Sequence, residues 1–510
     1  MNLLTDPWIP IQEKGHFEKI TLQQLLCGEK TGEICLPRDD MELASLQLLC
    51  AITQVLFTPE NKRELGHYVK QPLAQDDYQT AIQGKLDWFD LEHPETPFMQ
   101  FRGVIPSKTE PYTSLEKLLA GVADGANKVF VNQQGLGTHL FSSCVAISLF
   151  NMANNAPSVG GGFQGSFRGN TPITTMIKGR SLREGIWLNV LTKEILLKIM
   201  PWYEETRTQK PNYVDKDKSG KSFKYTEIGL VRGLLWQPAH YELYPPIKMD
   251  TCSCCGSVEY VYTNFKKEKF KYTVTGSWPH PLSPRKFNIN KGNKEFKFDS
   301  FTTKAPAWTH LSSFLYLKSD KKGGSEPSPI IDQAKSIMKG NRLNIIVGGY
   351  RYKPPQTATI IERRQELFSL FSGWEENEFI VREIIDIALS YKNSLRKSLY
   401  LFISQSLINA VSKKNKDRVS ELCSLAEFTY YQKTENIIHD SLSCFDFSNI
   451  DEEFKFLRTS LKKIVLLLFD QATEPYQEEP KMIKALATAR RSLHKSMKDL
   501  EPEGETHDKN

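Results

Sequence analysis

The sequence predicts an α+β protein, with a large mixed domain over residues 1–363 followed by an antiparallel four-helix bundle over residues 364–510. The first observation is the distribution of glycine and proline: 28 of 30 glycines and 24 of 27 prolines precede residue 360, and residues 374–474 contain neither. Because both residues are costly inside helices, this long stretch favours helices over a turn-rich β structure. The second observation is composition, since 40% hydrophobic and 25% charged residues are typical of a globular chain.

The second domain has the apolar spacing of amphipathic helices, most clearly from Phe379 to Leu395. Lys413–Asp417 is polar and predicts a link, Asp451 is the expected N-cap of the third helix, and Pro480 is an expected first-turn residue of the fourth. Short links between successive helices indicate an antiparallel bundle, and the polar tail 501–510 is expected to fray. The helices are expected over residues 379–410, 419–438, 451–471 and 480–500.

The first domain shows neither a regular βαβ alternation nor a fixed-period repeat, so we expect a mixed arrangement of helices and strands. Two polar segments, residues 206–224 and 318–329, are predicted to be mobile loops because they contain few apolar residues. The regular elements that stand out are helices over residues 41–56 and 143–153 and strands over residues 271–274 and 343–347.

Charge and hydropathy limit the classes of function. The chain has 66 basic and 60 acidic residues, a net charge of +6, so nucleic-acid binding would depend on local patches rather than on overall charge. The sequence has no apolar run long enough for a transmembrane helix, and its N-terminus lacks the basic-then-apolar order of a signal peptide. Nine cysteines, a sparse and odd number, fit poorly with a disulfide framework. We therefore expect a soluble, cytoplasmic protein.

A cysteine-rich segment, Cys252–Gly256, is a candidate metal knuckle. Its C-x-x-C pair, Cys252 and Cys255, would direct two thiolates at one ion, and zinc takes four nitrogen or sulfur ligands. Cys144 is the best further candidate, with His139 nearby in the sequence. Reduced cysteines that bind nothing are about as well favoured. A redox function is less favoured, because no strand-then-helix pattern surrounds the motif.

A glycine-rich segment, Pro157–Gly165, allows close approach of the backbone to a ligand, because three adjacent glycines carry no side chains. The segment matches neither a Walker loop nor a dinucleotide-binding motif, and by itself a flexible turn is the commoner explanation. A second segment, Phe265–Lys271, interleaves aromatic and basic residues. On a strand, its lysines 267, 269 and 271 would share one face and could meet phosphates, although lysines that protect an edge strand are the commoner explanation.

Candidate catalytic groups are scarce. Asp39 and Asp40 are more simply explained as helix N-cap residues than as metal ligands. The ten histidines are scattered, and the sequence has neither a metalloprotease histidine pair nor a nucleophile elbow. The residues themselves therefore favour a nucleic-acid-binding assembly subunit over an enzyme.

Many segments resemble one family, CasA, the large subunit of the type I-E CRISPR surveillance complex called Cascade. The resemblance implies a non-catalytic subunit that recognises the protospacer-adjacent motif (PAM) through the minor groove of duplex DNA. It also implies that the subunit starts strand opening and R-loop formation and helps recruit the helicase–nuclease. The resembling segments, from the N-terminus onward, are Met1–Leu4, Trp8–Pro10, Leu36–Leu43, Pro97–Gln100, Glu116–Val122, Phe130–Gln133, Leu230–His240, Cys252–Gly256, Trp278–Pro281, Gly348–Arg351 and Glu362–Arg364.

The resemblance also implies partners and roles for single residues. The partners are the 5′ handle of the guide RNA, PAM-bearing double-stranded DNA, the other Cascade subunits and the helicase–nuclease, with no membrane. A glycine loop reads the PAM, a lysine finger donates to the degenerate minor-groove acceptors, a glutamine wedge separates the strands, and an aromatic residue contacts the RNA handle. In that order the matching residues are Ser158, Val159, Gly160 and Gly161, then Lys269, then Gln356 with Thr357 and Ala358, and then Phe130.

The family's cysteines resemble two C-x-x-C pairs that hold one structural zinc ion. This chain has Cys144, Cys252 and Cys255, but Phe141 occupies the fourth position. The alternatives are therefore that His139 or Cys254 supplies the fourth ligand or that the metal is absent. Two other functions stay open at this stage: a zinc-dependent nucleic-acid-processing enzyme and a purely structural scaffold.

Overall fold

The computed structural model describes most of the chain and confirms the expected α+β class. The structure describes residues 1–106, 109, 111–121, 135–157, 163–169, 171–353, 356–406, 413–480 and 482–501, without the side chains of residues 353, 356–359, 406 and 413–420. The chain divides into two compact units, and each is described by itself below. The first unit comprises Met1–Thr303, Ser313–Lys339 and Asn344–Leu367, and the second comprises Lys304–Ser312, Gly340–Leu343 and Phe368–Asn510.

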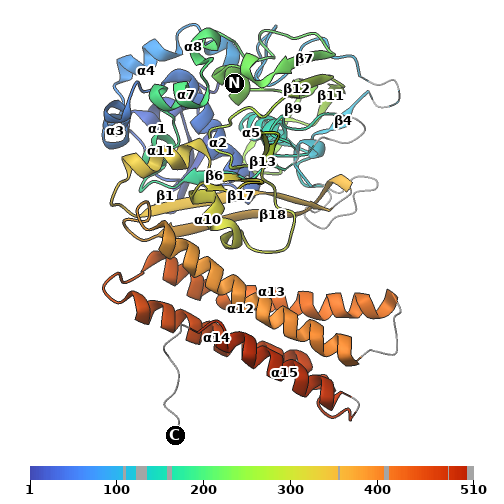
Figure 1. The fold of residues 1–510 in the computed structure, drawn as a ribbon. Helices are drawn as coiled ribbons and strands as arrows, with labels where there is room; N and C mark the ends of the chain where they lie inside the picture. The colour runs from blue at the N-terminus through green and yellow to red at the C-terminus, as the bar shows by residue number, and fades with distance from the viewer. Residues whose placement is uncertain are drawn as a thin grey trace. The chain divides into compact units, whose positions relative to one another are not determined.

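Short helices alternate with strands through the first part of the chain (Figure 1). The helices there are α1 (Leu22–Leu26), α2 (Asp39–Leu56), α3 (Lys62–Lys70), α4 (Gln75–Ile82), α5 (Ser142–Asn154), α6 (Leu182–Leu188), α7 (Lys193–Ile199), α8 (Tyr203–Thr206), α9 (Leu230–Leu234), α10 (Leu311–Leu315) and α11 (Pro329–Ile337). The expected helices over residues 41–56 and 143–153 are thus confirmed as α2 and α5.

The strands of this part are short, apart from the last two. They are β1 (Ile9–Glu13), β2 (His16–Ile20), β3 (Glu33–Ile34), β4 (Thr113–Ser114), β5 (Leu140–Phe141), β6 (Thr174–Ile177), β7 (Lys221–Lys224), β8 (His240–Leu243), β9 (Lys248–Thr251), β10 (Val258–Tyr262), β11 (Asn264–Glu268), β12 (Tyr272–Thr275), β13 (Arg285–Asn290), β14 (Asn293–Phe298), β15 (Lys318–Ser319), β16 (Gly323–Glu326), β17 (Leu343–Lys353) and β18 (Gln356–Leu370). The expected strands at 271–274 and 343–347 correspond to β12 and to the start of β17.

The strands form several small sheets rather than one large sheet. Their orders are β2-β1-β3, β5-β10-β9, β4-β11-β8, β12-β7, β14-β13-β16-β15 and β18-β17-β6. The prediction of two loops is wrong where these segments pair in sheets, because residues 221–224 form β7 and residues 318–319 and 323–326 form β15 and β16. Residues 207–220 form neither helix nor strand, as expected for a loop. Pairing with strands distant in sequence supplies backbone hydrogen bonds that composition does not reveal.

Helices α2 and α5 lie side by side within the first unit (Figure 1). Every residue of α5 is buried, including the polar Ser148, Asn151 and Asn154. A helix that is buried on all sides must pair its polar groups internally. These buried polar side chains therefore need specific partners, which belong to the site described below.

The second unit contains four long helices: α12 (Glu378–Ser406), α13 (Lys413–Ser443), α14 (Ile450–Thr473) and α15 (Ile483–Lys498). Helix α12 packs against the other three, and α13 also packs against α14. Their facing residues are apolar and buried, for example Leu399, Tyr430, Leu461 and Leu493. Among the described residues, no helix is long and apolar enough to cross a membrane.

Three local predictions for the bundle are wrong. The expected link Lys413–Asp417 lies inside α13, because lysine has good helix propensity and a polar run need not end a helix. Asn449, not Asp451, precedes the first residue of α14, and Asp451 lies in the first turn. Pro480 precedes α15 rather than occupying its first turn. Residues 502–510, most of the tail expected to fray, lie outside the described residues.

Candidate nucleic-acid interface and cysteine cluster

Three cysteines meet where helix α5 begins beside the β9–β10 hairpin. Cys252 and Cys255 lie in the connection between the two strands, and Cys144 lies in the first turn of α5. Their sulfur atoms all lie within 4.8 Å of one another. Cys144 and Cys252 are buried and Cys255 is half-buried. The predicted C-x-x-C and the distant Cys144 are thus brought together as a donor set suited to zinc.

Hydrogen bonds hold the cysteine cluster, and interactions within it shift the pKa values of its thiols. The Phe141 N–H donates to the Cys252 sulfur at 3.3 Å, and the Gly256 N–H donates to the Cys252 carbonyl at 3.0 Å. Interaction with Cys252, together with Cys254, Cys255 and burial, raises the pKa of the Cys144 thiol. Interaction with Cys144 and Cys252 lowers the pKa of the Cys255 thiol far below its usual range. A thiolate at Cys255 is the form that binds a metal.

The two candidate fourth ligands differ in position. His139 is not part of the cluster: its Nδ1 lies 3.0 Å from the Thr138 hydroxyl, and its Nε2 lies 3.7 Å from an Asp250 carboxylate oxygen. The Cys254 side chain is buried and interacts with Cys144 strongly enough to raise the pKa of that thiol. Within the described residues, the donor atoms that lie within 4.8 Å of one another belong to Cys144, Cys252 and Cys255 alone, so Cys254 and His139 both stay candidates for the fourth ligand.

The lysine-rich segment lies beside the end of the glycine-rich segment. The Lys267 ammonium lies 5.4 Å from the centroid of the Phe163 ring. The Gln164 side chain donates to the Tyr272 carbonyl at 2.7 Å and accepts from the Tyr272 N–H at 3.2 Å. Lys269, which is exposed, lies between these two anchors in the sequence. Folding thus joins two segments that are about a hundred residues apart in the chain.

The prediction that lysines 267, 269 and 271 share one strand face is wrong. Strand β11 ends at Glu268, so Lys267 lies in the strand while Lys269 and Lys271 lie beyond it. Phe270 is buried, and its ring stacks on His240 with a centroid distance of 4.6 Å. Burial of this ring interrupts the strand and separates the lysines.

Most of the other predicted DNA and RNA contacts lie outside the described residues. This holds for Phe130, for Ser158, Val159, Gly160 and Gly161, and for the side chains of Gln356, Thr357 and Ala358. The backbone of residues 356–358 opens strand β18. The structure does describe the residues that flank each of these segments, which we call the base of the segment. Some of these flanking residues were not singled out by the sequence pattern.

Asp40 is not the N-cap of α2, and its carboxylate is held by an arginine and a tyrosine. The residue before α2 is Arg38, and its guanidinium pairs with the Asp40 carboxylate, with Nε 2.9 Å from Oδ1. Both side chains are buried, and the Tyr350 hydroxyl donates to Asp40 Oδ2 at 2.7 Å. A buried charge needs an oppositely charged partner, and Arg38 and Asp40 supply that partner for each other. Asp39 instead pairs with Arg363 at 3.0 Å.

The fold is shared with solved structures of CRISPR proteins. Thermus thermophilus CasA (Cse1) matches with a TM-score of 0.71 at 16% identity, covering 98% of this chain and 99% of that chain. Thermobifida fusca Cse1 matches with a TM-score of 0.73 at 15% identity, covering 98% of each chain. A chain of a CRISPR RNA-guided surveillance complex matches with a TM-score of 0.64 at 15% identity, covering 97% of this chain and 99% of that chain. The fold is therefore that of a Cse1-type CRISPR protein.

The family model described as CRISPR-associated protein Cse1 matches residues 2–468. The match begins at the N-terminus and ends within α14, so it covers most of the chain. The chain belongs to the Cse1 family, and the expected resemblance to CasA is confirmed.

Proposed function

We propose that this chain is the large, non-catalytic subunit of the type I-E surveillance complex Cascade and acts in the cytoplasm. It recognises the PAM in the minor groove of duplex DNA, starts strand opening and R-loop formation, and helps recruit the helicase–nuclease. Membership of the Cse1 family supports the proposal, as does the fold shared with a chain of an RNA-guided surveillance complex. The partners are the guide RNA 5′ handle, PAM-bearing DNA, the other Cascade subunits and the helicase–nuclease.

One observation carries the proposal: the two segments that the family resemblance assigns to PAM reading are anchored to each other. Lys267 lies over the Phe163 ring, and Gln164 exchanges two hydrogen bonds with Tyr272. Lys267 and Tyr272 flank Lys269 in the sequence. Their partners, Phe163 and Gln164, directly follow the glycine-rich residues. A lysine finger and a bare backbone loop that act on the same base pairs require this proximity.

The chemistry of these residues suits a sensor that accepts several PAMs. The Lys269 ammonium donates to acceptors such as adenine N3 and thymine O2, which A·T and T·A pairs present alike. The small residues Gly160 and Gly161 permit close approach of the loop backbone to the groove floor. Unstacking a base step costs a few kcal/mol, and the DNA contacts offset this cost when the wedge enters.

The remaining predicted contacts complete the proposed role. Gln356, with Thr357 and Ala358 beside it, is the proposed wedge at the start of β18. Phe130 is proposed to stack on a base of the guide RNA handle, a contact worth about 1–3 kcal/mol. Both assignments come from the family resemblance, and the wedge is tested below through the opening of the duplex.

The cysteine cluster fits a structural zinc ion. Cys144, Cys252 and Cys255 would hold it, with Cys254 as the proposed fourth ligand because its buried side chain interacts with Cys144. Zinc bound there would cross-link the start of α5 to the β9–β10 hairpin. The hairpin has little apolar core of its own, since Met249, Val258 and Tyr260 are exposed, so this cross-link would stabilise it.

A zinc-dependent nucleic-acid-processing enzyme is the second candidate function. Within the described residues, the cysteine cluster is the only group of three or more histidine, cysteine or acidic side chains arranged to hold a metal. A catalytic zinc keeps a position open to water and substrate. Two of the three cysteines are buried, which favours a closed structural site.

The test is PAM-dependent binding by the chain assembled with guide RNA and the other Cascade subunits. We expect Lys269→Ala to lower affinity for a PAM-bearing duplex about tenfold, as for loss of a base-edge contact. Lys297→Ala is the matched control, since Lys297 is also exposed but lies on β14. Equal affinity of the parent complex for duplexes with and without a PAM would contradict the proposed function, and metal-dependent cleavage by the isolated chain would favour the enzyme.

A further inference from the structure

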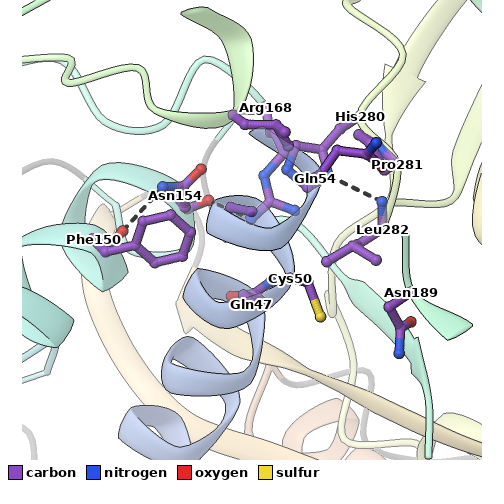
Figure 2. A pocket seen from close by; sticks show the side chains of 12 residues that line it. Gln47, Cys50, Gln54, Phe150, Asn154, Arg168, Asn189, His280, Pro281 and Leu282 are labelled. Atoms are coloured by element: carbon purple, nitrogen blue, oxygen red, sulfur yellow. Dashed lines mark hydrogen bonds between the residues drawn. The ribbon is translucent and has the colours of Figure 1, made fainter. Parts of the chain in front are cut away.

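Arg168 is a buried arginine without a carboxylate partner among the described residues. It is 1% exposed, and burial lowers its pKa to about 9. Its guanidinium donates to four neutral oxygens: those of the Ser283 and Thr174 hydroxyls, the Asn154 carbonyl at 2.6 Å and the Asn155 side-chain amide at 2.7 Å. Figure 2 shows it above α2, beside Asn154 and His280, where it lines a cavity of about 10 Å³. Burying a guanidinium group without a carboxylate partner costs free energy, so the arrangement indicates a structural role for Arg168.

The position of Arg168 in the chain indicates what this structural role is. Helix α5 ends at Asn154, the glycine-rich segment follows, and the chain returns to Arg168. The bonds from Arg168 to Asn154 and Asn155 therefore join the two ends of the glycine-rich segment. The guanidinium group binds the two residues that precede the glycine-rich segment, while Arg168 itself follows that segment. A lysine, with its single ammonium, cannot form the same set of hydrogen bonds.

From this base, an unbroken series of hydrogen bonds runs through the core. The Asn155 amide donates to Asn151 Oδ1 at 3.0 Å, and the Asn151 amide donates to the Tyr350 hydroxyl at 2.8 Å. The Tyr350 hydroxyl donates in turn to Asp40 at 2.7 Å. Asp40 pairs with Arg38, which also donates to the Ala120 carbonyl at 3.3 Å. Each side chain in this series is buried.

The series touches the base of three segments with proposed nucleic-acid contacts. Arg168 closes the glycine-rich segment. Tyr350 lies in β17, three residues before Lys353 at the end of the strand that leads to the proposed wedge. Ala120 lies two residues before the segment 122–134, which contains Phe130. These three bases are far apart in the sequence, yet one set of buried, hydrogen-bonded polar side chains joins them, in which Arg168 Nε is left without a partner.

We infer that this buried series, which we call the core relay (Arg168, Asn155, Asn151, Tyr350, Asp40 and Arg38), holds the described bases of the three segments, which are Asn154–Asn155 with Arg168, Tyr350 of β17, and Ala120, in a fixed relative placement. The inference rests on the proposed function and extends it. Tyr350 and Arg168 are then positioning residues for strand opening. Buried polar groups that pair with one another favour one arrangement, because a shift that breaks a pair leaves a buried partner unsatisfied at a high cost.

Tyr350→Phe gives the sharpest test, because it removes one hydroxyl from the middle of the core relay and keeps the ring. Tyr78→Phe is the matched control: the Tyr78 hydroxyl is also buried and donates to the Leu4 carbonyl at 2.6 Å, outside the relay. Tyr350→Phe removes two buried hydrogen bonds, from Asn151 and to Asp40, whereas Tyr78→Phe removes one, so Tyr350→Phe should lose more thermal stability. Only Tyr350→Phe should slow strand opening, because it alone cuts the connection between β17 and the base of the glycine-rich segment.

The readout is strand opening by the assembled complex, followed with 2-aminopurine in the base pairs next to the PAM. We expect Tyr350→Phe to reduce the opening rate about three- to tenfold and Tyr78→Phe to leave it within a factor of about 1.5 of the parent. Arg168→Lys should resemble Tyr350→Phe if it folds. Equal rates for the two tyrosine variants, whether both reduced or both parental, would overturn the inference.

The same experiment separates this inference from the proposed function. If the parent complex does not open a PAM-bearing duplex faster than one without a PAM, the proposed function fails. If the parent does so and Tyr350→Phe matches Tyr78→Phe, the function stands and the core relay does not position the wedge. As a second measurement, Asp40→Asn combined with Tyr350→Phe should reduce opening no further than the worse single variant, because both cut the same series.

Discussion

The ammonium of Lys267 lies 5.4 Å from the centroid of the Phe163 ring, which ties strand β11 to the end of the glycine-rich segment. A cation over an aromatic face contributes about 0.5–1 kcal/mol at an exposed site. Phe163 is half-buried, and in the sequence it lies two residues after Gly161, the last residue proposed to read the PAM. The contact therefore helps to hold Phe163 against the lysine segment.

Phe163→Leu should weaken PAM-duplex binding by the assembled complex about two- to fivefold, because it removes the aromatic face and keeps apolar bulk. Phe163→Tyr retains the face and should bind like the parent. The measurement is the equilibrium dissociation constant at fixed salt. A loss of affinity for Phe163→Tyr equal to that for Phe163→Leu would show that the contact with Lys267 does not matter.

Lys269→Ala and Gln356→Ala should have different effects, because Lys269 is proposed to contact DNA through its charge and Gln356 is the proposed neutral wedge residue. Loss of one phosphate or groove contact by a lysine should reduce the slope of log K against log salt concentration by about 1. Gln356 is neutral, so Gln356→Ala should leave the slope unchanged and instead slow strand opening. Titrations of a PAM-bearing duplex at several salt concentrations test this. An unchanged slope for Lys269→Ala would mean that its ammonium does not contact DNA.

The cysteine cluster should carry about one zinc ion per chain, measured by elemental analysis of purified protein. Cys144→Ser and Cys255→Ser should abolish it and lower the melting temperature, because metal binding contributes to folding. Cys444→Ser is the control, since Cys444 is exposed and lies outside the cluster. Cys254→Ser should also reduce zinc content and His139→Ala should not. The reverse result would make His139 the fourth ligand.

Buried His280 should make folding sensitive to mildly acidic pH. Burial, with the nearby charge of Arg168, holds the pKa of His280 well below its usual value near 6.5. In the unfolded chain His280 protonates as pH falls below about 6.5, whereas the folded chain excludes the proton. Stability from this residue is therefore complete above that pH and is lost below it, by about 1 kcal/mol per pH unit.

Urea unfolding between pH 7.5 and 5.5 measures this loss. His280→Asn retains an acceptor for the Leu282 N–H, which donates to His280 Nδ1 at 3.1 Å, and it removes the titrating group. The variant should therefore show a flatter dependence of unfolding free energy on pH than the parent. Parallel pH profiles for the two proteins would show that another group controls the acid sensitivity.

Two leucines on α14 test the packing of the bundle. Leu461 is fully buried, whereas Leu467 is 46% exposed. Leu461→Ala should destabilise the second unit by about 2–5 kcal/mol, and Leu467→Ala by less than about 1 kcal/mol. Hydrogen exchange of peptides from α12 to α15 would report the loss. Similar effects of the two substitutions would mean that the observed helix face does not form the core.

Local sequence properties determined the helical second half of the chain. The absence of glycine and proline over residues 374–474 and the apolar spacing were enough, since both act within a few turns of one helix. The helix ends were predicted less well. The polar run Lys413–Asp417 continues a helix, and Asp451 lies inside one, because end positions depend on packing and on neighbouring segments.

The cysteine cluster was partly predictable. The C-x-x-C spacing of Cys252 and Cys255 is local and visible in the sequence, but the approach of Cys144 depends on how α5 packs beside the β9–β10 hairpin. The same holds for Lys267 and Phe163, which come together only in the folded chain. Pairing across more than a hundred residues follows from sheet and helix packing, which no local pattern records.

The core relay shows what only tertiary structure decided. The run of asparagines at the end of an apolar helix, Asn151, Asn154 and Asn155, was a signal that polar groups enter the core. The partners of these residues could not be read from it, because an arginine such as Arg168 is usually exposed and pairs with acids. Burial reverses that expectation: once water is excluded, each polar group must find whatever donor or acceptor the fold brings within reach.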